Sequence, residues 1–200
     1  MTTPKLPNFS KVPSPNIPKR PTSTKVTAGR PGYEYLTCYQ LGLVIQELTE
    51  EFTKRHIESP RRRMQMDEAS RSNPQNIAEG YTQPSLKGYI YLSGIAHGSN
   101  EELTKDFIRF LKQENLQIWT KEHPKIREFR AFRVEWISKT SLNTPTLPKD
   151  PQEAANMLHT LCQMEGYLLA KLVDSLKEKH KTEGGLTEKL YRERKKYRGF

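Results

Sequence analysis

The sequence predicts an all-α protein. Apolar residues recur at intervals of three and four along four long segments, as they do on the buried side of a helix. No segment shows the convincing alternation of apolar and polar residues that a half-buried strand requires. Proline or glycine separates the segments, at Pro60, Gly80 and Gly184. We therefore expect an antiparallel, up-and-down four-helix bundle over residues 33–183.

The first two helices are predicted on either side of Pro60. The first carries one apolar stripe, formed by Leu41, Val44, Leu48 and Phe52. The second should run from Arg61 to Glu79 and stop at Gly80. Its expected core contacts are Met64, Ala69, Ile77 and Ala78. Pro74 lies inside this helix, where it removes a backbone donor, so we expect a kink near Ser70.

The third helix has the clearest pattern. Its apolar stripe consists of Leu86, Tyr89, Leu92, Ala96, Ser99, Leu103, Phe107 and Phe110. Small residues gather at its middle, which predicts close packing of a neighbouring helix there; they are Ser93, Gly94, Ala96, Gly98 and Ser99.

An extended connection over residues 112–150 follows the third helix. It should contain a short helix opened by Pro124 and a proline-spaced linker over 138–150. The last helix has a strong start signal, because Asp150 suits the N-cap, Pro151 the first turn and Glu153 the capping box. Its stripe is Ala154, Leu158, Leu161, Leu168, Leu172 and Leu176.

Charge divides the chain into a neutral body and two basic ends. The 200 residues include 33 Lys and Arg against 23 Asp and Glu, a formal net charge of +10. Residues 1–32 hold six cations, no acid and seven of the fourteen prolines, which predicts a disordered basic arm. Residues 184–200 hold six Lys and Arg against two Glu and are expected to form a basic suffix tail. The body between them is electroneutral.

Several functional classes are disfavoured. No apolar run approaches the roughly 20 residues that span a bilayer, the first 30 residues lack the apolar core of a secretory signal, and only two cysteines occur. We therefore expect a cytoplasmic protein without membrane contacts. The five histidines show no metal-ligand spacing, and no glycine-rich phosphate loop is present. We expect no enzymatic activity, no metal and no cofactor.

Nucleic-acid binding is the functional hypothesis that the charge distribution favours. One candidate cluster opens the second helix and comprises Arg61, Arg62, Arg63 and Arg71. Another is the C-terminal tail, with Lys189, Arg192, Arg194, Lys195, Lys196 and Arg198, where Tyr191 and Tyr197 are available to stack on bases. The N-terminal arm is a third. The basic run over 125–133 is interleaved with acids and indicates a solvated face. The alternative is an oligomeric protein-interaction scaffold that binds no nucleic acid.

Two motifs in the middle of the chain resemble a known family. Asn76-Ile77-Ala78-Glu79-Gly80 is followed by Ile95-Ala96-x-Gly98-Ser99-x-Glu101-Glu102-Leu103. Together they resemble the bacterial four-helix bundle family that includes proteins encoded in ribosomal RNA intervening sequences and the accessory variability determinant of diversity-generating retroelements. Residues 167–192 look like the subgroup with an added suffix region.

The resemblance implies a bundle that assembles as a ring-like pentamer and binds a reverse transcriptase and its template RNA, which favours RNA over DNA. The chain departs from the retroelement protein in its basic arm, Pro74, the extended connection and the suffix. Self-association is also suggested by aromatic residues expected on the surface, at Tyr33, Tyr35 and Tyr39.

The motif residues have structural interpretations of their own. We expect Asn76 to be a polar clasp at a helix crossing, and Gly98 and Ser99 to be close-packing positions. Glu79 would lie in the last turn of its helix, where the dipole disfavours a carboxylate, so it should find a partner in Arg71 or in the amides of 85–87. Glu102 belongs to the same motif.

Overall fold

The structure is a computed structural model that describes residues 30–138 and 140–199. The described residues form six α-helices and one short 3-10 helix, so the prediction of an all-α protein is confirmed. Most of the predicted N-terminal arm, residues 1–29, lies outside the described residues. The elements are η2 (Gly32–Tyr35), α1 (Thr37–His56), α2 (Pro60–Thr82), α3 (Leu86–Gln113), α4 (Pro124–Ala131), α5 (Pro151–Glu183) and α6 (Leu186–Tyr197).

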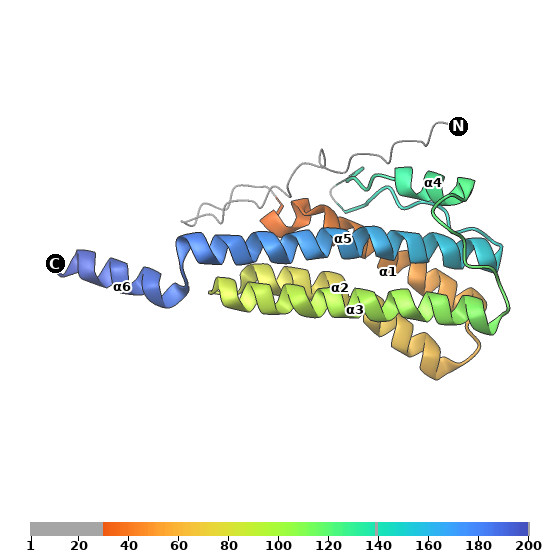
Figure 1. The fold of residues 1–200 in the computed structure, drawn as a ribbon, viewed down its shortest axis with the longest axis horizontal. Coiled ribbons are helices and arrows are strands. Elements are labelled where there is room, and N and C mark those ends of the chain that lie inside the picture. The colour runs from red at the N-terminus through yellow and green to blue at the C-terminus, as the bar shows by residue number, and fades with distance from the viewer. Residues whose placement is uncertain (1–29, 139, 200) are drawn as a thin grey trace, which may run out of the picture.

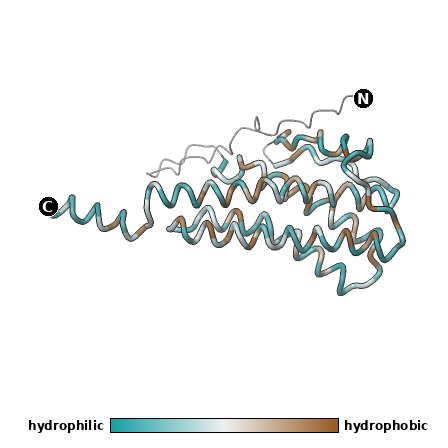
Figure 2. The backbone as a smooth tube through the Cα atoms, in the orientation of Figure 1, coloured by the Kyte–Doolittle hydropathy of each residue, from teal (hydrophilic) through white to brown (hydrophobic). Residues whose placement is uncertain are grey.

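Four of the helices enclose a common core. α1 packs against α2 and α5, and α3 packs against the same two helices, so the contacts form a closed cycle. Figure 1 shows these helices lying lengthwise beside one another, with α4 over α5 and with α6 projecting beyond the end of α5. Hydrophobic residues recur along the four long helices (Figure 2). In the described part of the chain, no helix is both long enough and apolar enough to cross a bilayer.

The predicted apolar stripes are buried almost as the spacing requires. The α1 stripe is fully inaccessible to solvent, and Phe52 meets Phe107 and Phe110 edge to face, at ring-centre distances of 5.3 and 5.0 Å. A second group of buried residues surrounds Ile77, Tyr89 and Leu172 nearer the far end of α5. The burial of these aromatic and aliphatic side chains stabilises the fold, since each contributes roughly 1.5–3 kcal/mol on leaving water.

The end of α2 differs from the prediction. Gly80 is not a helix stop, because α2 continues to Thr82 and ends where Pro84 disfavours helical geometry in the residue before it. Gly80 is buried, and a Cβ atom at this position would lie 2.7 Å from Cδ2 of Tyr89. The glycine is therefore required by the approach of the Tyr89 ring from α3. The predicted core contact of Met64 is also wrong, since this side chain is 57 % exposed.

The middle of α3 departs from the prediction too. Ser93 and Ala96 are buried as expected. Gly94 and Gly98, however, are exposed, and a Cβ atom at either position would have no described atom within 4 Å other than those of the adjoining stretch of α3. The expected close packing at Gly98 is therefore wrong within the described chain. Each glycine weakens the helix by about 1 kcal/mol relative to alanine, with no packing inside the molecule to compensate.

The connection between α3 and α5 is a packed cover over α5. Ile126, Phe129 and Leu147 are buried in the main core. Asn156 of α5 fixes its backbone: Nδ2 donates to the Gln117 carbonyl at 2.9 Å, and Oδ1 accepts from the Trp119 amide at 2.8 Å. Because of this cover, α5 is buried on all sides from Ala154 to Cys162. The segment expected to be a linker over 138–150 thus contributes to the core.

The folded body begins before residue 33. The Arg30 guanidinium lies 3.7 Å above the centre of the Trp136 ring and pairs with Glu34 at 3.1 Å. Residues 30–32 therefore belong to the body rather than to the predicted arm. Tyr33 and Tyr39 contact each other edge to face and are half-buried, so of the three tyrosines expected on the surface only Tyr35 is largely exposed.

We predict that Gly80→Ala destabilises the protein by about 1–2 kcal/mol, because overpacking against Tyr89 outweighs the gain in helix propensity. In a Tyr89→Leu background the clashing ring is absent, so the same substitution should be neutral or stabilising. Urea unfolding of the four chains in this double-mutant cycle measures both effects. An equal gain in stability in both backgrounds would contradict the role assigned to Gly80.

Candidate nucleic-acid interface

The C-terminal candidate cluster lies on a separate helix. Gly184, at φ 76°, ends α5, and the Glu188 carboxylate accepts a hydrogen bond from the Gly185 amide at the start of α6. Every residue from Leu186 to Tyr197 is exposed. The sequence therefore encodes a chain break followed by a new helix, and this helix buries none of its residues against the body.

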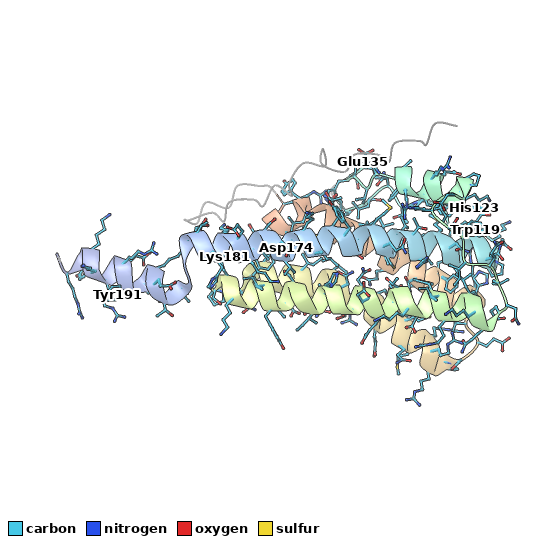
Figure 3. The ribbon with its side chains drawn as sticks, viewed as in Figure 1. Trp119, His123, Glu135, Asp174, Lys181 and Tyr191 are labelled. Atoms are coloured by element: carbon cyan, nitrogen blue, oxygen red, sulfur yellow. The ribbon has the colours of Figure 1, made fainter. Side chains whose placement is uncertain are left out.

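Two different surfaces run along α6. Spacings of three and four place Lys189, Arg192 and Lys196 on one side. Leu186, Leu190 and Tyr197 lie on another side, where the Tyr197 side chain is 93 % exposed. Tyr191 lies on a third side of the helix, away from both of these surfaces, and is also exposed (Figure 3).

Most cations of the cluster are unpaired. Lys189 forms an ion pair with Glu183 of α5 at 3.2 Å. Within the described part of the chain, no ion pair involves the five others, which are Arg192, Arg194, Lys195, Lys196 and Arg198. These guanidinium and ammonium groups are thus free to bind phosphates.

The arginine cluster at the start of α2 is divided in its roles. Arg63 serves the fold, because it donates a hydrogen bond at 2.9 Å to the Ile57 carbonyl just beyond the end of α1. Arg61 is exposed and Arg62 is half-buried. Arg71 is exposed but shares a polar hollow on α2 with two carboxylates, those of Glu68 and Glu79. These neighbours weaken the positive potential around Arg71.

The structure does not bring the two clusters together. α2 begins at one end of the molecule, next to the end of α1, whereas α6 extends from the opposite end (Figure 1). Figure 3 shows the same separation, with Tyr191 on α6 far from Trp119 and His123 at the other end. A single short stretch of nucleic acid therefore meets one cluster or the other.

The motif residues lie mainly at the contact between α2 and α3. Asn76 donates to the Ser72 carbonyl at 2.7 Å within α2, whereas the contact across to α3 is made by Ser72 Oγ, which lies 3.0 Å from Ser99 Oγ. Glu79 accepts from Gln75 at 2.9 Å, so the expected partner at residues 85–87 is wrong. The Gly88 amide is capped by Ser85 instead. Glu102 is exposed and has no partner among the described residues.

A buried carboxyl group on α5 was not anticipated from the sequence. Glu165 is fully buried, and a Cβ atom at Gly42 of α1 would lie 2.6 Å from its Oε1. Neither carboxyl oxygen has a hydrogen bond of good geometry among the described residues. Burial raises the pKa of Glu165 well above its usual range, and the side chain of Asn73 offsets only part of this rise. The group is therefore neutral in the folded protein until the solution is well above the usual carboxyl range.

The other titratable candidates do not assemble into a centre. Within the described chain, no group of three or more His, Cys, Asp or Glu side chains is placed to hold a metal ion. Cys38 and Cys162 are free and buried, and burial raises the pKa of Cys38 to about 12. Burial also lowers the pKa of His159.

Comparisons of the chain with protein families, with curated proteins and with solved structures gave no match.

We predict that Glu165→Gln removes a pH dependence of stability. The pKa of Glu165 in the folded protein is above its value in the unfolded chain, which is about 4.3. The stability that protonation of Glu165 contributes is therefore fully present below about pH 4.3, and it is lost as the pH rises through the pKa of the folded protein. The variant has no proton to lose, so its advantage over the parent chain should grow from pH 5 to pH 8. Urea unfolding across this range measures the difference.

The matched control is Glu178→Gln, on an exposed position of the same helix. It should leave the pH dependence unchanged. Parallel pH curves for the parent chain and Glu165→Gln would contradict the assignment of a neutral buried carboxyl.

Proposed function

We propose that this protein is a non-enzymatic nucleic-acid-binding accessory protein whose interface is α6. One observation carries the proposal: a helix that buries none of its residues presents four cations without an ion pair among the described residues, a fifth at its C-cap, and two exposed tyrosines. An isolated helix of twelve residues is only marginally stable in water, so a partner is needed to hold it. A polyanion that neutralises the cations supplies such a partner.

The chemistry of α6 suits a single-stranded nucleic acid. Lysine and arginine side chains bind phosphates and release counterions, which gives affinity without sequence specificity. Exposed tyrosines stack on unpaired bases, and each stacked base contributes about 1–3 kcal/mol. These features suit single-stranded RNA and DNA alike, and the family resemblance favours RNA as the ligand.

We further propose that the body is an antiparallel four-helix bundle that carries α6. Three-residue connections between α1 and α2 and between α2 and α3 support an antiparallel course, since short loops join neighbouring helices in this way. The family resemblance adds a homo-oligomer and a reverse transcriptase as a candidate protein partner, and the low cysteine content favours a cytoplasmic location.

A second candidate function is a protein-interaction scaffold without nucleic-acid binding. The observation in its favour is the apolar side of α6, where Leu186 and Leu190 are exposed. An amphipathic helix of this kind suits an apolar groove on another protein. Binding through this side depends on the leucines, whereas binding to nucleic acid depends on the cations.

We predict that the full chain binds single-stranded RNA with steep salt dependence. If about four phosphates are neutralised, the logarithm of the binding constant should fall with a slope of roughly −3 against the logarithm of salt concentration. Arg192→Glu with Lys196→Glu should weaken binding at least tenfold and make the slope shallower by about 1.4, because two phosphate contacts are lost. Fluorescence anisotropy with labelled RNA at several salt concentrations measures both quantities.

The matched control is Arg127→Glu with Arg130→Glu, which changes two exposed cations on α4. It should alter affinity less than twofold. Absence of RNA binding by the parent chain at low salt would overturn the proposed function. Loss of binding in Arg61→Glu with Arg62→Glu, but not in the α6 variant, would move the site to the start of α2.

A further inference from the structure

One side of α3 is exposed and has no partner in the described chain. It is called the α3 face here and consists of Lys87, Tyr91, Gly94, Ile95, Gly98 and Glu102. The spacing of three and four places these residues on one side of the helix. Tyr91 is 69 % exposed and Ile95 is 37 % exposed, although both belong to a long helix whose other sides are packed against α2 and α5.

The packing of a single molecule does not require the two glycines of this face. Apart from the adjoining stretch of α3 itself, no described atom lies within 4 Å of a Cβ position at Gly94 or Gly98, so a larger residue fits at both and would favour the helix. Gly80 and Gly42, by contrast, are each required by a side chain that approaches within 2.7 Å. Glycine on an exposed helix surface allows another helix to come close to the backbone.

The α3 face is complementary to itself in the antiparallel direction. Around a two-fold axis between Gly94 and Ile95, Tyr91 lies opposite the partner's Gly98, and Ile95 lies opposite the partner's Gly94. Each large side chain thus meets a glycine. In the same register Lys87 lies opposite the partner's Glu102. A parallel arrangement would instead place Lys87 against the same lysine of the second copy.

Charge supports this register. Lys87 and Glu102 are exposed and form no ion pair among the described residues. Two copies related by the two-fold axis create two such pairs, one at each end of the contact. We propose that the α3 face is an isologous interface through which two copies of this chain associate with antiparallel α3 helices.

This inference does not rest on nucleic-acid binding, because α6 takes no part in the contact. It also differs from the ring-like pentamer that the family resemblance implies. A single pair of helix faces buries less area than a standard interface, so the dimer should be weak, with a dissociation constant on the order of tens of micromolar.

Sedimentation equilibrium of the full chain, from about 1 to 500 µM, tests the proposal. We expect a monomer–dimer equilibrium. Gly98→Gln should leave the folded monomer intact, as circular dichroism and thermal unfolding can check, and should shift the equilibrium to monomer by blocking Tyr91 of the second copy. A monomer at every concentration, or a pentamer, would overturn the proposal.

Charge exchange tests the register. Lys87→Glu alone and Glu102→Lys alone should each weaken dimerisation about tenfold, since two like-charged contacts replace two ion pairs. The double variant restores opposite charges and should recover the parent affinity to within about threefold. Lys112→Glu, on the same helix but outside the contact, is the control. Failure of the double variant to recover, or equal weakening by the control, would overturn the two-fold register.

Discussion

Complete burial of α5 between Ala154 and Cys162 is the constraint on which the rest of the structure depends. A helix buried on every side needs neighbours on every side, and here α1 and α3 cover one part while α4 and the preceding connection cover the other. The polar group of Asn156 is tolerated in this environment because its amide bonds to backbone groups of the connection and to the Gln152 carbonyl of its own helix. Glu165, less than one turn beyond Cys162, lacks such partners and remains neutral instead.

The same constraint explains where the helix becomes free. After Leu176 no residue of α5 is buried, and the helix ends at Gly184 outside the packed region. α6 then begins without a neighbour, so its surface is not committed to the core. α6 and the α3 face are the two candidate functional surfaces. In both, exposed side chains or glycines make no contact that stabilises the single folded chain.

The apolar stripes and the start of α5 were predictable because they depend on local spacing and capping. The role of Gly80 was not predictable. In the sequence, a glycine buried inside a helix cannot be told from a glycine that ends one, and only the position of the Tyr89 ring against Gly80 distinguishes the two. For the same reason the sequence predicts close packing at Gly98, where the described residues make none. The cationic residues of α6 were identified from sequence, whereas the use of Arg63 by the Ile57 carbonyl depends on a tertiary contact.

We propose that α6 is independent of the body until nucleic acid binds it. Hydrogen exchange measured by mass spectrometry, with and without single-stranded RNA, tests this most directly. In the free protein the amides of α6 should exchange within seconds while those around Leu158 and Leu161 remain protected, because only the latter are buried. RNA should then protect residues 186–197 and leave the start of α2 unchanged. Protection of α6 equal to that of the core without RNA, or no change on adding RNA, would contradict the account.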